Sequence, residues 1–421
     1  MLQNKTAFTK ADILLPKNEN MEKWAVVACD QYTSEPDYWD ETANIVGDDK
    51  SALKLILPEI YLEEEGVSER IEKIQKEMTK YVGEDTFAEY KNTLIYIERT
   101  QNDGKVRAGI VGAVDLEMYD YRKGSVSQVR ATEATVVERI PPRMAVRRGA
   151  ELELPHIMIL VDDPEKTVVE MAANSENKEL VYDFALMQKG GSIKGWKLSD
   201  EACEKVISAL EKLGDIDTFN KKYNLDEKFP LVYAMGDGNH SLATAKEFYE
   251  ELKKNNPDKD LSNHPARYAL CEIVNLHSEA LEFEAIHRIV TNVDVEKLMG
   301  ILTAELELSD ETSEQRIDVV IKGETVTKYV HKPLSKLAVG SLQLVLDRVL
   351  AEMGAKIDYI HGIEVVEKLS MADNAVGFVL QDMAKKDLFP TVICDGALPR
   401  KTFSMGHAWD KRYYVEARKI K

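Results

Sequence analysis

The sequence predicts an α/β protein with a larger and a smaller domain, and α+β character stays open as an alternative. Short apolar runs typical of buried strands alternate with longer segments whose apolar residues recur at helical spacing. The chain has 421 residues, 44% of them hydrophobic, which favours more than one domain core. The pattern of elements restarts near Thr291, so we expect domains at 1–290 and 291–421.

Composition narrows the classes of function. The formal net charge is -19, and a strongly negative protein is repelled by nucleic acids and by anionic membranes, so neither is expected as a partner. The four cysteines are far apart in the sequence and predict neither a zinc ribbon nor a disulfide framework. Residues 1–17 contain no sustained apolar stretch behind a basic head, so no secretory signal is expected, and no run of roughly 20 apolar residues occurs. We therefore expect a cytoplasmic protein.

The N-terminal part of the chain opens with an apolar run at 24–29 that predicts a buried strand. Residues 66–82 carry apolar side chains at helical spacing among charges, which predicts a surface helix. Residues 93–100 and 105–116 are rich in strand formers and flank Asp103-Gly104, so they predict a hairpin.

Further strands of the expected larger domain are 156–161, 180–187, 193–198, 230–235, 268–276 and 285–290. We expect the last two to share a sheet with 230–235. Asp162 and Asp163 are interpreted as capping residues, because Pro164 suits the first position of a helix. Ser199 is expected to cap an amphipathic helix that ends near 213.

The expected smaller domain is predicted to contain, in order, a helix at 293–302, a hairpin at 316–330, a long helix from 334 to 350, a strand at 357–360, a helix at 363–369, and strands at 375–380 and 412–417. The long helix carries a continuous apolar stripe.

The best candidate for a chemical site lies where the strand 230–235 leads into a helix. Its residues are Gly236, Asp237, Gly238, Asn239, His240 and Ser241. The glycines permit a sharp turn, and free amides at a helix start bind phosphate or carboxylate. Asp237 could hold a divalent cation or accept a proton, and His240 could donate to a phosphate oxygen or shuttle a proton. The alternative is an ordinary turn in which Asp237 only caps the helix.

A second candidate is a cluster of arginines in an otherwise acidic chain. Its members are Arg130, Arg139, Arg143, Arg147 and Arg148. They could fold over a phosphorylated ligand, with Arg143 and one neighbour making bidentate contacts and Glu133 acting as a base. The alternative is a solvated helix face whose arginines pair with carboxylates.

Weaker candidates lie elsewhere in the chain. Asp30 and Tyr32 follow a strand end, where open α/β sheets often contact ligands, although an ordinary turn explains them too. His287 and Arg288 lie within a strand pattern and are open to structural pairing, and Lys401 is open to being a surface lysine. No histidine pair has metal-ligand spacing, and no P-loop or Gly-x-Ser-x-Gly motif stands at a suitable junction.

At these residues the sequence resembles the bacterial and archaeal family called domain of unknown function 1015. The family hallmark is a strand ending in Asp-Gly-His-His-Arg before a helix, and here the hallmark reads Asp237-Gly238-Asn239-His240-Ser241. Other matches are Val26-Val27-Ala28 with Tyr32, Glu133-Ala134-Thr135 with Arg143, His287-Arg288, Tyr359-Ile360-His361 and Pro399-Arg400-Lys401-Thr402.

The hallmark is similar in turn to the Gly-x-x-Arg signature of the ParB and sulfiredoxin-like superfamily, which includes nucleotide-hydrolysing and free-serine-kinase members. The resemblance implies a mixed-sheet domain, a phosphate-binding helix start at 237–241, Glu133 as a base and Arg143 as a clamp for phosphoryl charge. Asn239 and Ser241 replace a histidine and an arginine of the hallmark. The missing phosphate ligand would therefore come from Arg139, Arg147 or Lys401, and Ser241 would bind phosphate through its hydroxyl and amide.

We therefore predict a nucleotide- or phosphate-dependent enzyme, a phosphotransferase acting on a small hydroxylated metabolite, with Mg²⁺ and ATP or ADP as cofactors. Its catalytic residues would be Asp237, also the metal ligand, His240 and Glu133. One alternative is a non-catalytic regulator that binds a nucleotide or an anionic metabolite. Another is a metal-dependent hydrolase that uses Asp237 and His240. In each case the partner is a small anionic molecule.

Overall fold

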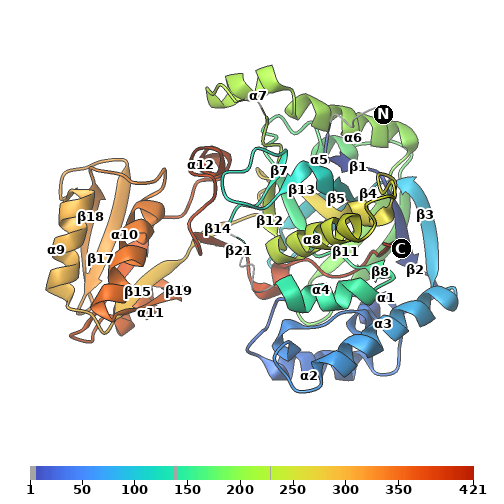
Figure 1. Cartoon of the computed structure of the whole chain (residues 1–421), viewed down its shortest axis with the longest axis horizontal. Helices are drawn as coiled ribbons and strands as arrows, with labels where there is room; N and C mark the ends of the chain where they lie inside the picture. The colour runs from blue at the N-terminus through green and yellow to red at the C-terminus, as the bar shows by residue number, and fades with distance from the viewer. Residues whose placement is uncertain (1–5, 134, 136–139, 228) are drawn as a thin grey trace. The chain divides into compact units, whose positions relative to one another are not determined.

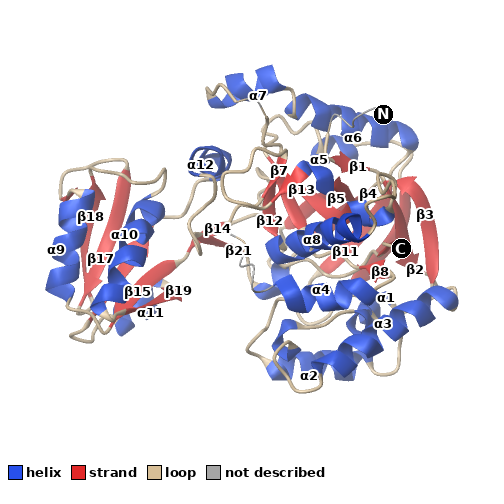
Figure 2. Ribbon diagram, in the orientation of Figure 1, coloured by secondary structure: helices blue, strands red, loops and turns tan. Residues whose placement is uncertain are grey.

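The computed structural model describes residues 6–133, 135, 140–227 and 229–421 (Figure 1). The chain divides into two compact units, Met1–Leu281 with His407–Lys421 and Glu282–Gly406. These units differ from the expected domains, because they divide after Leu281 and the last segment belongs to the larger unit. Both units combine helices with β-sheets, so the predicted α/β class is confirmed (Figure 2). The main sheet of the larger unit is mixed, whereas the strand pairs of the smaller unit are antiparallel.

One mixed sheet organises the larger unit. Its order is β10 (Glu179–Ala185), β11 (Ser192–Lys197), β4 (Ile95–Thr100), β5 (Val106–Asp115), β13 (Tyr268–Asn275), β9 (Met158–Val161), β12 (Tyr233–Asp237), β7 (Val129–Arg130) and β6 (Tyr119–Asp120), with β1 (Phe8–Thr9) beside β5. Strand β9 runs parallel to β13 and antiparallel to β12. The predicted hairpin is β4 with β5. The end of β12 at Asp237 therefore lies beside the start of β9 at Met158.

Both faces of this sheet are covered. Alternate residues of β5 enter two different apolar clusters, with Ile110 in one and Val111 in the other, as the period of a strand requires. The helices of the larger unit are α1 (Met21–Trp24), α2 (Pro36–Val46), α3 (Val67–Gly83), α4 (Ile140–Gly149), α5 (Val169–Ala173), α6 (Asp200–Leu213), α7 (Ile216–Tyr223) and α8 (Asn239–Asn255). Two short pairs complete the unit: β2 (Ala11–Pro16) with β3 (Phe87–Thr93), and β8 (Leu152–Glu153) with β22 (Arg418–Lys419).

The smaller unit has its own sheet and core. The sheet order is β16 (Leu308–Ser309), β18 (Glu324–Val330), β17 (Gln315–Ile321), β20 (Ala375–Leu380), β15 (His287–Thr291) and β19 (Lys356–Ile360). Its helices are α9 (Val295–Leu306), α10 (Ala338–Met353), α11 (Ile363–Leu369) and α12 (Leu388–Asp395), and β14 (Phe283–Ala285) pairs with β21 (Phe403–Met405). The predicted apolar stripe is buried in this core from Val339 to Leu350, but α10 begins only at Ala338, and Leu334 lies before it and is exposed.

Two predicted strands are wrong in the same way. Residues 24–28 are buried, but the chain leaves α1 at Trp24, and this segment forms a β-bridge only between Val27 and Tyr413. Backbone bonds run from Ala28 N to Arg412 O (3.0 Å) and from Tyr414 N to Val26 O (2.8 Å). The strand expected at 412–417 is the other half of this contact. Both segments are buried because they pack against each other and the core, and neither belongs to the main sheet.

Other corrections concern β15 and the two aspartates. Strand β15 belongs to the sheet of the smaller unit, not to that of β12. Asp163 accepts a hydrogen bond from Val168 N (2.8 Å) and so closes a turn before α5 instead of capping a helix at Pro164. Asp162 does not cap a helix but binds the side chains of Lys222 (2.8 Å) and His277 (2.6 Å). Among the described residues, no helix is long and apolar enough to cross a membrane.

Candidate functional site

The predicted strand-turn-helix is present at the end of β12. The strand ends at Asp237, Gly238 has a φ of +82°, and α8 begins at Asn239. A Cβ at Gly238 would lie 3.0 Å from the Cα of Ile157, the residue before β9. Glycine is therefore needed here for two reasons: it tolerates the positive φ, and it leaves room for the neighbouring backbone. Asp237 Oδ1 accepts a hydrogen bond from Gly238 N (2.9 Å), so one amide of the expected anion site is already bound by the protein.

The first turn of α8 brings Ser241 to a histidine. Ser241 Oγ lies 3.0 Å from Nε2 of His156, and Nδ1 of the same ring lies 2.7 Å from the hydroxyl of Tyr414. Both His156 and Tyr414 are buried. Oδ2 of Asp30 lies 3.8 Å from Nε2. Three residues from distant parts of the chain therefore surround one imidazole.

Charges accumulate around Asp30 and Asp237. Burial raises the pKa of Asp30, but His156, a hydrogen bond from Gln31 and the charge of Lys411 lower it, so the pKa lies below its ordinary value. Lys411 Nζ also lies 3.7 Å from Oδ2 of Asp237, and both side chains are largely buried. Lys411 is therefore a cation placed near both carboxylates.

The C-terminal segment 407–421 supplies Lys411 and Tyr414 to this site. Buried arginines of the sheet hold the segment by its backbone. Arg99 donates to the carbonyl oxygens of Trp409 (2.6 Å) and Lys411 (2.8 Å), and Arg107 donates to that of Asp410 (2.7 Å). Because an arginine can donate up to five hydrogen bonds, these two side chains hold three backbone carbonyls of the segment.

The arginines of α4 lie opposite carboxylates. Arg143 pairs with Glu59, Arg147 with Glu153 (2.6 Å), and exposed Arg148 with Glu251. Burial lowers the pKa of Arg143, although nearby Cys29, Asp30 and Tyr414 act in the opposite direction. Arg139 lies outside the described residues.

A cavity of about 150 Å³ connects these groups. Arg143 from α4 and Ser241 from α8 both line it, together with Glu59, His156 and Tyr414. The side chains of Leu55, Ile56 and Leu57 form an apolar part of the cavity wall. The described residues that line the cavity do not include Asp237, His240 or Glu133. Two candidates predicted from separate motifs therefore meet at one hollow.

Glu133 lies close to the strand that carries the motif. The hydroxyl of its neighbour Thr132 donates to the carbonyl oxygen of Met235 (2.7 Å), which fixes this segment beside the end of β12. Glu133 itself is half-buried.

The remaining candidates lie away from the cavity wall. Tyr32 has a φ of +52°, and its ring stacks on Tyr38 with the ring centroids 3.6 Å apart. In the smaller unit, Arg288 is fully buried and donates to Gln343 (3.2 Å). His287 and Lys401 also lie in that unit, and Nδ1 of His287 accepts from Leu380 N (3.2 Å).

The donor set does not fit a metal held by the protein alone. Within the described part of the chain, no three or more His, Cys, Asp or Glu side chains gather so that they could hold a metal ion. Asp237, the predicted ligand, lies beside Lys411, whose positive charge opposes that of a bound cation. We therefore derive no step through magnesium.

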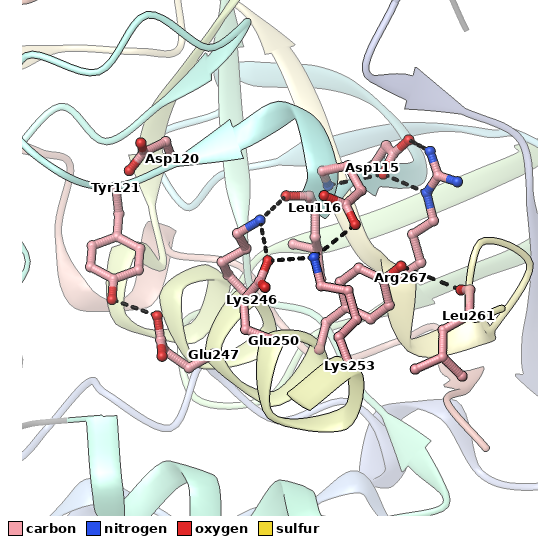
Figure 3. Close-up of polar contacts among 12 residues, drawn as sticks. Asp115, Leu116, Asp120, Tyr121, Lys246, Glu247, Glu250, Lys253, Leu261 and Arg267 are labelled. Carbon is pink, nitrogen blue, oxygen red and sulfur yellow. Dashed lines mark hydrogen bonds and ion pairs between the residues drawn. The ribbon is translucent and has the colours of Figure 1, made fainter. Parts of the chain in front are cut away.

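Residues on both sides of β6 hold the far side of α8 (Figure 3). Lys246 donates to the carbonyl oxygen of Leu116 (2.9 Å), Lys253 pairs with Glu117 (2.9 Å), and Tyr121 donates to Glu247 (2.7 Å). These contacts fix the orientation of the helix, and with it the position of its first turn.

Sequence reasoning missed four residues of the site: His156, Lys411, Tyr414 and Glu59. A usable signal existed for His156, which stands at the start of the predicted strand 156–161. Nothing local marked the others, because their role depends on which segments pack together.

The sequence matches a family described as "Protein of unknown function (DUF1015)" over residues 11–350. The chain belongs to this family. The match covers most of the larger unit and part of the smaller one. The resemblance inferred from the hallmark is thereby confirmed at the level of the family. No curated protein matches the chain.

Several solved structures are similar to this member of the DUF1015 family. A conserved hypothetical protein from Pyrococcus furiosus is 12% identical with a TM-score of 0.36, covering 75% of this chain and 96% of that one. Free serine kinase in complex with AMP is 11% identical with a TM-score of 0.39, covering 75% and 93%. SbnI from Staphylococcus aureus, truncated at its C-terminus, is 10% identical with a TM-score of 0.35, covering 70% and 82%. The likeness is remote, so the site is interpreted from its own geometry.

Proposed function

We propose that this protein is a nucleotide-dependent phosphotransferase that acts on a small hydroxylated metabolite, and that the cavity between α4 and α8 is where the phosphoryl group is transferred. One observation carries the proposal: Arg143 and Ser241, selected from separate motifs, line the same cavity. A guanidinium and a helix start that face one hollow suit the charge that develops on a phosphoryl group during transfer.

Each residue has an expected role. Arg143 stabilises the charge on the transferred group, and the first turn of α8 with Ser241 binds phosphate oxygens. Glu59 lines the cavity, so we propose it, in preference to Glu133, as the carboxylate that accepts the proton of the metabolite hydroxyl. Lys411 holds Asp237 and the α8 start in position through their ion pair. ATP or ADP is the expected phosphoryl donor.

The test measures turnover of ATP, ADP and CTP with a panel of hydroxy metabolites. Arg143→Ala is expected to lower kcat/KM about 100-fold, the usual effect of removing one group that stabilises transition-state charge. Arg148→Ala is the matched control, because Arg148 lies on the same helix but forms an exposed pair with Glu251. Equal activity in the wild type and in Arg143→Ala would remove the basis of the proposal.

A regulatory binding protein is the second candidate. Two observations favour it: Arg143 is already paired with Glu59, and Asp237 already binds the amide of Gly238. A ligand would have to displace Glu59 from Arg143 and Asp237 from the amide of Gly238, and such an exchange of partners is what a regulatory switch requires. Nucleotides that raise the unfolding temperature without any turnover would favour this role, since ligand binding to the native state stabilises it by mass action.

A further inference from the structure

The contact between Ser241 and His156 has the geometry of an activated nucleophile. The hydroxyl oxygen and Nε2 are 3.0 Å apart, and a third group, the Tyr414 hydroxyl, holds Nδ1 from the other side at 2.7 Å. A nucleophile within hydrogen-bond reach of a base that is itself oriented by a third group is the general signature of covalent catalysis.

The surroundings of Tyr414 permit the tautomer of His156 that a base needs. Tyr414 is fully buried, and its oxygen accepts a hydrogen bond from Cys29 N (3.2 Å). The Cys29 thiol interacts with the Tyr414 hydroxyl and is available as an acceptor for its proton. A phenol oxygen has a second lone pair, which can accept a proton from Nδ1 of His156. The lone pair of Nε2 then faces Ser241.

The charges around the pair favour the products of deprotonation. Asp30 Oδ2 lies 3.8 Å from Nε2, where it stabilises an imidazolium. Arg143 lines the same cavity as Ser241, and Ser241 belongs to the first turn of α8, where the helix dipole is positive. An anionic group attacked by Ser241 is therefore held by positive charge.

We propose that Ser241 accepts a phosphoryl group covalently, with His156 as its general base. The Oγ of Ser241 forms a bond to the terminal phosphorus of a nucleoside triphosphate, and the bond from that phosphorus to the bridging oxygen breaks. The electron pair leaves with the nucleoside diphosphate, and the hydroxyl proton passes to Nε2 of His156. In the second step the metabolite oxygen forms a bond to the same phosphorus, and the bond from phosphorus to Oγ of Ser241 breaks. The proton of the metabolite hydroxyl passes to Glu59, and Oγ of Ser241 takes its proton back from Nε2 of His156. This inference rests on the proposed function for the identity of the donor.

The first experiment tests the nucleophile without any nucleotide. The full-length protein is incubated with a fluorophosphonate probe, which reacts with activated serines, and the labelled residue is located by peptide mass spectrometry. We expect labelling at Ser241, none in Ser241→Ala, and a rate at least about 100-fold lower in His156→Gln, as for loss of a general base. Ser175→Ala is the control and is expected to label like the wild type, because the Ser175 hydroxyl donates to the carbonyl oxygen of Ala172 (2.7 Å).

The second experiment replaces the probe with ATP or CTP and searches for phosphoserine at 241. Phosphorylation there, lost in His156→Gln while the unfolding temperature is unchanged, is the expected result. The inference is overturned if the folded wild type is neither labelled by the probe nor phosphorylated at Ser241. If the protein turns over nucleotide but the probe does not label Ser241, the inference is overturned and the proposed function stands. Labelling at Ser241 without phosphorylation or nucleotide turnover overturns the phosphoryl step and the proposed function together, leaving only the activated serine.

Discussion

Replacement of Arg412 by methionine is expected to destabilise the larger unit strongly. Arg412 Nε lies 2.9 Å from Glu272 and its Nη2 lies 2.7 Å from Glu416, and both carboxylates are fully buried. The guanidinium also donates to the carbonyl oxygens of Pro155 (2.8 Å) and Tyr413 (3.1 Å). One side chain thus neutralises two buried charges and ties the C-terminal segment to the core.

The magnitude follows from what the substitution leaves behind. Removing one partner of a buried ion pair costs about 3–5 kcal/mol, because the remaining carboxylate stays buried without its cation. Arg107 still lies 3.6 Å from Glu272, so most of the loss arises at Glu416. We therefore expect a loss of about 3–5 kcal/mol in the free energy of unfolding, well above the ~1 kcal/mol limit of an exposed pair.

Urea denaturation, followed by far-UV circular dichroism, measures the effect. Arg122→Met is the matched control, since Arg122 pairs with Asp120 but its side chain is 81% exposed. Arg412→Lys keeps the charge and is expected to lose less than Arg412→Met. If the methionine variants at 412 and 122 unfold at the same urea concentration, the buried cluster does not stabilise the segment and the reasoning fails.

Three further predictions concern single groups. Gly238→Ala is expected to lower the free energy of unfolding by about 1–2 kcal/mol in urea titrations, because alanine at a φ of +82° is strained; no loss would show that the turn relaxes. Burial raises the pKa of Glu153, but two arginines hold it below the ordinary 4.5, so its stabilising effect is present above that pH and lost as the pH falls through the folded pKa. Glu153→Gln should therefore flatten the acid side of a pH profile of stability, and an unchanged slope would contradict this. Burial raises the pKa of the Cys29 thiol to about 12, so little of it is thiolate at pH 8. Iodoacetamide at pH 8 should therefore modify exposed Cys394 before Cys29, as measured by peptide mass spectrometry. Faster modification of Cys29 would contradict this reasoning.

Much of the secondary structure could be predicted from local sequence. The hairpin of β4 and β5, the surface helix α3 and the turn between β12 and α8 were each marked by a period or by a glycine within a few residues. The motif at 236–241 was found for the same reason, since the strand, the turn and the helix start are contiguous.

The failures have one physical cause. Residues 24–29 predict a strand because the run is apolar, and an apolar run reports burial without naming the partner. The segment 412–417 is buried as well, although Arg412 and Glu416 in it are charged. The bridge between Val27 and Tyr413 joins opposite ends of the chain, which no local pattern encodes. The expected boundary near 291 missed the return of the C-terminal segment for the same reason.

By itself, the sequence determined the α/β class, the family and the two motifs that contribute Arg143 and Ser241. Only the tertiary structure decided that His156 stands between Ser241 and Tyr414, residues 85 and 258 positions away from it. Helical and strand periods specify which face of an element is buried. Which faces meet is decided by packing across the whole chain, and the chemistry of this site depends on that choice.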